Sequence, residues 1–122
     1  MSFNYVIKYI IQSKKKIRRQ SRLINLNKME NIIKAIQEKK ATVIDVRSQM
    51  EFDMEHFPGA LNIPLETVGD EAAKIGAMPK PIVVYCRSGN RSGMAKTILG
   101  QHGITDVHNG GGIFDMMNIA RN

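Results

Sequence analysis

Two short runs of β-branched and aliphatic residues constrain the fold of this chain more than any other feature. They span Thr42–Val46 and Ile82–Tyr85, and continuous apolar runs of this length are typical of strands buried on both faces of a sheet. Segments with the apolar spacing of helices lie between and after them, as in parallel strands joined by helical crossovers. The sequence therefore predicts an α/β fold with a mostly parallel sheet flanked by helices on both faces.

Weaker patterns complete the predicted elements. Three shorter strand candidates bring the sheet to about five strands, and they are Leu23–Asn25, Ala60–Ile63 and Thr105–His108. Helices are expected from Asn27, as the N-cap, to about Lys39, from Leu65 to Ile75, after the loop that begins at Cys86, and at the C-terminus. The glycines at 110–112 are expected to break the chain before the last helix.

The positive charge of the chain is concentrated in one terminal segment. The 122 residues carry a formal net charge of +7, and residues 1–22 hold seven Lys and Arg but no Asp or Glu. Residues 23–122 hold eleven basic and eleven acidic residues, and the chain has no Trp. We therefore predict a basic N-terminal extension over 1–22 and one domain over 23–122, and the balanced domain gives no reason to expect a nucleic-acid partner.

The apolar residues of the extension follow helical spacing, with lysines among them; they are Phe3, Val6, Ile7, Ile10 and Ile17. This pattern allows a basic amphipathic helix in weak contact with an anionic membrane surface. The alternative is a partly ordered extension, or a helix packed on the domain. No stretch approaches 18 apolar residues, and no secretory signal is apparent, so we expect a cytoplasmic protein, peripheral to the membrane if the extension binds it.

The single cysteine, Cys86, excludes an intramolecular disulfide and a Cys-rich zinc site. It follows a predicted strand and precedes a predicted helix, at the edge of a parallel sheet where ligands bind. The loop is Cys86-Arg87-Ser88-Gly89-Asn90-Arg91-Ser92, and its amide groups can converge on the sulfur as an anion cradle. With Arg87 and Arg91 nearby, this setting favours a nucleophilic thiolate. The alternative is a small, inert, buried cysteine.

Five segments in order, from about Leu23 to the C-terminus, resemble the rhodanese homology domain family. They are Ile44-Asp45-Val46-Arg47, Glu51-Phe52, Glu55-His56-Phe57-Pro58-Gly59-Ala60, Val83 to Ser92, and Asn109-Gly110-Gly111-Gly112-Ile113. Two features depart from the family pattern: Glu55 stands where glycine is usual, and no Trp follows Phe114.

The resemblance implies a single-domain sulfurtransferase. Cys86 would be the catalytic residue, taking a sulfane sulfur from thiosulfate or another persulfide donor and holding it as a persulfide. A thiol, cyanide or a sulfur-accepting protein would then receive the sulfur. The remaining loop residues would bind substrate, and they are Arg87, Ser88, Gly89, Asn90, Arg91 and Ser92. No metal or organic cofactor is expected.

Three other functions fit parts of the sequence. A cysteine-dependent phosphatase or arsenate reductase shares the cradle, but its signature has five residues between Cys and Arg, and four lie between Cys86 and Arg91. A non-catalytic rhodanese-like sulfur carrier or binding module is the second. A Cys–His hydrolase is the third, although structural roles are expected for His56, His102 and His108. Asp45 and Arg47 are expected to pair with each other or with nearby backbone.

Overall fold

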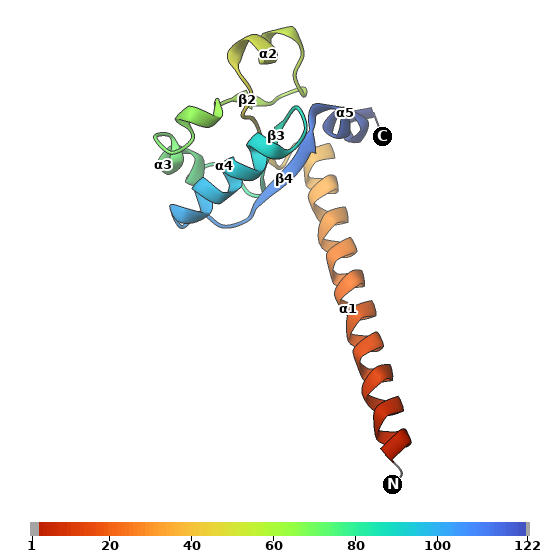
Figure 1. The fold of residues 1–122 in the computed structure, drawn as a ribbon. Coiled ribbons are helices and arrows are strands. Elements are labelled where there is room, and N and C mark those ends of the chain that lie inside the picture. Colours follow the sequence, from red (N-terminus) through yellow and green to blue (C-terminus); the bar gives the residue numbers. More distant parts are fainter. Residues whose placement is uncertain (1–2, 122) are drawn as a thin grey trace. The chain divides into compact units, whose positions relative to one another are not determined.

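Four parallel strands form a single sheet in the computed structural model, which describes residues 3–121. The strands are β1 (Thr42–Asp45), β2 (Leu61–Asn62), β3 (Ile82–Cys86) and β4 (Val107–Gly112), in the order β2-β1-β3-β4. The helices are α1 (Phe3–Gln37), α2 (Gln49–Met54), α3 (Ala72–Gly76), α4 (Asn90–Gln101) and α5 (Ile113–Arg121), with a 3₁₀ turn, η1, over Leu65–Thr67 (Figure 1). The predicted parallel α/β fold is confirmed.

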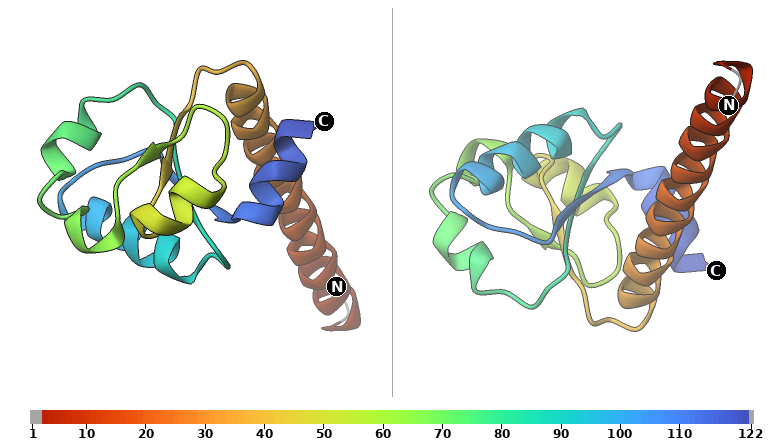
Figure 2. Two further views of the ribbon diagram at one scale, coloured as in Figure 1. Left: turned by 90° about the horizontal axis from the view of Figure 1, so that it is seen from above. Right: turned by 90° about the horizontal axis from the view of Figure 1, so that it is seen from below.

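The two β-branched runs form the centre of the sheet because their side chains can be buried on both faces. Ile44 and Val84 belong to one core cluster together with Ala95 and Leu99 of α4. Tyr85 is one residue out of phase with Val84 and points to the other face, where its Oη accepts a hydrogen bond of 2.9 Å from the Phe57 amide. Helix α4 covers the first face and α5 the second (Figure 2), so the prediction of helices on both faces is also confirmed.

The sheet has four strands rather than about five, because the predicted strand at Leu23–Asn25 is wrong. These residues lie inside α1, and Asn27 is an interior helical residue rather than an N-cap. No glycine or proline precedes Pro58, so nothing in the sequence interrupts the helix. The described chain divides into two units between Ile32 and Ile33, and α1 continues across this boundary. The predicted domain start at residue 23 stays a prediction.

Two other predicted elements differ in their extent. The expected helix from Leu65 to Ile75 is split into η1 and α3. The last strand runs through Gly112, although the glycines were expected to break the chain. In both places the backbone follows the contacts of the folded chain rather than local residue preference.

A buried ion pair at the end of β1 ties the following segment to the sheet. Asp45 is fully buried, and its carboxylate accepts hydrogen bonds from the Arg47 amide at 2.9 Å and from Arg47 Nη2 at 2.7 Å. Nη2 also donates to the Glu55 carbonyl at 2.6 Å. Glu55 has an extended backbone with a φ of −165°, a conformation that does not require the glycine usual at this position. The predicted pairing of Asp45 with Arg47 is confirmed.

Replacing Asp45 with alanine should lower the free energy of unfolding by about 3–5 kcal/mol, because Arg47 would remain buried without its counter-charge. Urea unfolding measures this change. Glu38→Gln is the matched control, since it removes an exposed carboxylate that pairs with Lys40 and should cost less than about 1 kcal/mol. Equal losses in the two variants would show that the buried pair is not a special requirement of the fold.

Candidate active site

Cys86 is the last residue of β3 and is 1% exposed. The chain turns immediately after it, and Gly89 enters α4 as the N-cap with a φ of 100°, in the left-handed region that favours glycine. The structure thus places the sulfur at the carboxyl end of a central parallel strand and at the start of a helix. This is the placement that the sequence predicted for the loop.

Hydrogen-bond donors of the loop converge on the sulfur. The Gly89 amide donates to Cys86 Sγ at 3.0 Å, and the Ser92 hydroxyl lies 3.4 Å from the same atom. Burial raises the pKa of the Cys86 thiol. Hydrogen bonds from the Ser92 hydroxyl and from the backbone amides of Ser92, Ser88 and Gly89 together lower this pKa by more than burial raises it, so the pKa falls below its ordinary value to about 7. The arrangement stabilises a thiolate at neutral pH.

Asn109, on the neighbouring strand β4, holds the loop in this shape. Its Nδ2 donates to the Gly89 carbonyl at 3.0 Å, and its Oδ1 accepts from the Gly111 amide at 2.9 Å. The Ser92 hydroxyl lies 2.7 Å from the same Oδ1, so its one proton has two acceptors, this oxygen and the sulfur. From the sequence, Asn109 was recognisable only as part of a glycine-rich segment, and this bracing contact was not predicted.

The glycines of β4 allow the strand backbone to pack directly against the loop. Between the pairs Val84–Asn109 and Cys86–Gly112, the register advances by two residues on β3 and three on β4, which is a β-bulge. A Cβ atom at Gly112 would meet the carbonyl oxygen of Arg87, and one at Gly89 would lie 3.4 Å from the Gly111 Cα. Three glycines in a strand are a sequence signal for such a close backbone approach.

Arg91 forms an ion pair with a carboxylate and is therefore not an unpaired cation beside the sulfur. Its Nη1 and Nη2 donate to the two carboxylate oxygens of Glu51 at 2.8 and 3.0 Å. Hydrogen bonding to Arg91 lowers the pKa of Glu51 to about 2. Glu51 also forms the capping box of α2 with Ser48, so Arg91 links the loop to α2. Arg87, in contrast, is exposed, with no hydrogen-bond or ion-pair partner among residues 3–121.

Two of the three histidines have side-chain partners other than the sulfur, and the third ends α4. His56 Nδ1 lies 2.9 Å from the Phe52 carbonyl, and its ring stacks on that of Phe52. His108 lies 2.6 Å from Asp106 Oδ1, and His102 caps α4 at the end opposite the loop. None of them forms a hydrogen bond with Cys86 in the described part of the chain, so the geometry gives no Cys–His pair. The described residues contain no cluster of three or more His, Cys, Asp or Glu suited to a metal ion.

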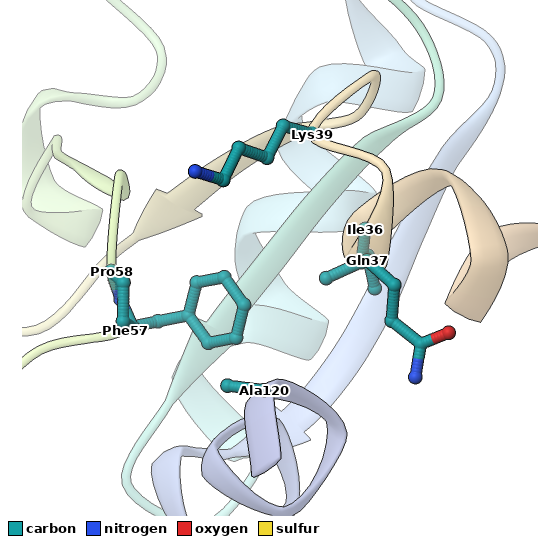
Figure 3. Close-up of a pocket in the computed structure, with 6 residues that line it drawn as sticks. All are labelled: Ile36, Gln37, Lys39, Phe57, Pro58 and Ala120. Atoms are coloured by element: carbon teal, nitrogen blue, oxygen red, sulfur yellow. The ribbon is translucent and has the colours of Figure 1, made fainter. Parts of the chain in front are cut away.

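Two overlapping hollows lie away from the sulfur-bearing loop. The larger has a volume of about 360 Å³, and its lining residues are Ile36, Gln37, Lys39, Phe57, Pro58 and Ala120 (Figure 3). The smaller, of about 230 Å³, also reaches Val43, which is out of phase with Ile44 on β1 and belongs to the α5 side of the sheet. Because no loop residue lines either hollow, neither is a binding space for a substrate of Cys86.

Comparisons with known proteins agree with this architecture. A family model described as Rhodanese-like domain matches residues 28–115. Thiosulfate sulfurtransferase PspE of Escherichia coli (strain K12) is 43% identical over 76 residues, covering 60% of this chain and 71% of PspE. Thiosulfate sulfurtransferase GlpE of Pseudomonas savastanoi pv. phaseolicola (strain 1448A / Race 6) is 33% identical over 82 residues, covering 67% of this chain and 76% of GlpE.

A solved structure, described as rhodanese with anions from E. coli, superposes on this chain with a TM-score of 0.57. The sequence identity is 41%, and the match covers 62% of this chain and 89% of that one. The predicted fold class is thereby confirmed, whereas the roles predicted for the individual loop residues stay predictions.

The thiolate fraction of Cys86 should rise about tenfold per pH unit and level off above a midpoint near pH 7, because the folded protein lowers its pKa to about 7. The chain has one cysteine, so the ultraviolet absorbance of the thiolate reports this residue alone. Ser92→Ala should move the midpoint upward by removing a donor to the sulfur. Ser88→Ala is the matched control because it keeps the backbone amide. A wild-type midpoint near 8.5, the value of a free cysteine, would contradict the proposed cradle.

Proposed function

The chain belongs to the rhodanese-like domain family and is a rhodanese-type sulfurtransferase, and from this premise we propose that it moves a sulfane sulfur from thiosulfate, or another persulfide donor, to a thiol or cyanide through a Cys86 persulfide. The observation that carries the proposal is the set of donors on Cys86 Sγ, namely the Gly89 amide and the Ser92 hydroxyl. Two relatives named as thiosulfate sulfurtransferases support the choice of donor.

In the first half-reaction, the Cys86 thiolate attacks the outer sulfur of thiosulfate. A new S–S bond forms to Cys86, while the S–S bond of thiosulfate breaks and its electron pair leaves with sulfite. Thiolate and thiosulfate together carry three negative charges, as do the persulfide anion and sulfite, so no proton or external electron is required. The cradle assists because a lowered thiol pKa maintains the attacking thiolate near neutral pH.

In the second half-reaction, an acceptor thiolate or cyanide attacks the terminal sulfur of the persulfide. The Cys86–S bond to that sulfur breaks, its electron pair returns to Cys86, and the thiolate is regenerated. The donors of the loop suit both halves, because each half begins and ends with an anionic sulfur, which is Sγ in the thiolate and the terminal sulfur bonded to Sγ in the persulfide. The sulfur is carried covalently, so the proposed cycle requires no metal or organic cofactor.

The other loop residues have distinct proposed roles. Arg87, which is exposed and free of protein partners within the described residues, would attract the anionic donor, with Arg91 as a second cation near the sulfur. Gly89 and Ser92 would hold the sulfur through the contacts described above. Ser88 and Asn90 shape the turn into α4. A sulfur-accepting protein could replace a small thiol, because the chemistry at the terminal sulfur is the same.

Cys86→Ala should abolish sulfur transfer from thiosulfate to cyanide while leaving the fold intact, because the covalent carrier is lost. Wild-type protein treated with thiosulfate should gain one sulfur, roughly 32 Da by mass spectrometry, and a thiol reductant should remove it. The treated Cys86→Ala variant should show no gain. Transfer activity in Cys86→Ala would refute the mechanism. An unmodified wild-type cysteine would favour the alternative of a non-catalytic binding module.

Arg91→Ala should raise the Michaelis constant for thiosulfate by roughly tenfold, the equivalent of one lost charge-assisted contact. Glu51→Gln is the discriminating partner variant. It removes the opposing charge, keeps the capping box of α2, and should leave donor affinity unchanged or improved. If both variants weaken thiosulfate binding equally, Arg91 acts only by tying the loop to α2, and its role in donor binding is wrong.

A further inference from the structure

The first unit of the structure exposes a stripe of large aliphatic side chains along α1. Val6, Ile10, Ile17 and Ile24 are between 42% and 65% exposed. Their separations of four, seven and seven residues place them on one side of the helix. A row of aliphatic side chains held in water loses the free energy that burial would supply, so this stripe is a candidate contact surface.

The opposite side of the same helix is basic. Lys8, Lys15, Arg19 and Arg22 follow the helical repeat, and at 100° per residue this row is centred about 180° from the aliphatic stripe. Every charged residue before Glu30 is a Lys or Arg. The aliphatic stripe and this basic row therefore lie on opposite sides of the helix, with Ile11 bordering the basic row and Lys14 bordering the stripe. No carboxylate before Glu30 neutralises the charge.

This distribution fits a helix that lies in the plane of a membrane surface. No described helix is long and apolar enough to cross a bilayer, and the stripe from Val6 to Ile24 extends about 27 Å along the helix axis. Interfacial helices combine low overall hydrophobicity with an apolar side and a Lys/Arg-rich polar side. Long basic side chains can then reach lipid phosphates while their methylene groups cover apolar surface.

We propose that residues 4–24 of α1 dock the protein on a bilayer surface rich in anionic lipids. Val6, Ile10, Ile17 and Ile24 enter the boundary between headgroups and acyl chains, and the basic residues bind lipid phosphates. This inference concerns where the protein acts and does not depend on the sulfur chemistry of Cys86.

A second copy of the chain is a poorer occupant of the stripe. In a coiled coil, Ile10, Ile17 and Ile24 would form one apolar row, but the companion row three residues later is polar, and it consists of Ser13, Gln20 and Asn27. The positions that flank such a seam include Lys14 and Lys16, which would face like charges. A nucleic acid would satisfy the basic side and leave the aliphatic stripe in water, so it also fits less well.

Co-sedimentation of the full chain with vesicles tests the proposal. Vesicles of phosphatidylcholine mixed with phosphatidylglycerol should bind the protein at least about tenfold more tightly than pure phosphatidylcholine, because several basic residues meet the anionic surface. Added salt should weaken that binding. The double variant Ile10→Asn/Ile17→Asn, which keeps the charge, should lose about tenfold or more in affinity through lost apolar burial. Gln12→Asn/Gln20→Asn is the matched control for helix propensity and should bind like wild type.

Three outcomes would overturn the proposal. The first is equal binding of wild type and Ile10→Asn/Ile17→Asn to anionic vesicles. The second is no vesicle binding together with tight binding to a single-stranded RNA probe that is insensitive to the isoleucine changes. The third is a wild-type dimer in sedimentation, lost in the isoleucine variant, without vesicle binding. Sulfur transfer should be the same in all these variants, so a failure here is distinguishable from a failure of the proposed reaction.

Discussion

The contact between the backbone of β4 and the loop after β3 is the constraint on which the site depends. Gly112 allows this contact because any side chain there would meet the carbonyl of Arg87. Asn109 then bonds both the loop, through Gly89, and its own strand. With the loop fixed in this way, the Gly89 amide can point at Cys86 Sγ. The reactivity proposed for the sulfur is therefore set by a neighbouring strand that carries no reactive group.

Two ion pairs of different character hold the segments around this loop. Asp45 and Arg47 form a pair that is almost fully buried, where loss of one partner leaves an isolated charge. Glu51 and Arg91 form a pair that is about one-third exposed, so water screens it and either partner can be replaced at less cost. The first pair belongs to the framework, while the second connects α2 to the loop at a place where a substrate anion could compete for Arg91.

The sequence was informative where local pattern and burial coincide. Apart from Asp45, the buried positions of β1 and β3 are apolar, and the short motif from Cys86 to Ser92 predicts a strand end, a turn and a helix in succession. The central sheet and the placement of the sulfur were therefore predictable from the residues alone.

The sequence was uninformative where residues far apart in the chain determine an element or a contact. Leu23–Asn25 resembles a strand but has no neighbouring strand, so it stays within the helix that surrounds it. Likewise, the bond from Asn109 to Gly89 and the pairing of Arg91 with Glu51 could not be inferred, because each contact joins residues that only the folded sheet brings together. The roles of the loop residues in sulfur transfer remain proposals for experiment.

The single cysteine has a consequence for how the protein withstands oxidants. A stabilised thiolate is the form of cysteine that peroxides oxidise first, to a sulfenic acid. In many thiol proteins a second cysteine traps this product as a disulfide, but no other cysteine exists in these 122 residues. Burial at 1% exposure and the enclosing loop thus form the protein's own barrier to overoxidation, and recovery of a sulfenic acid would require a thiol from outside the chain.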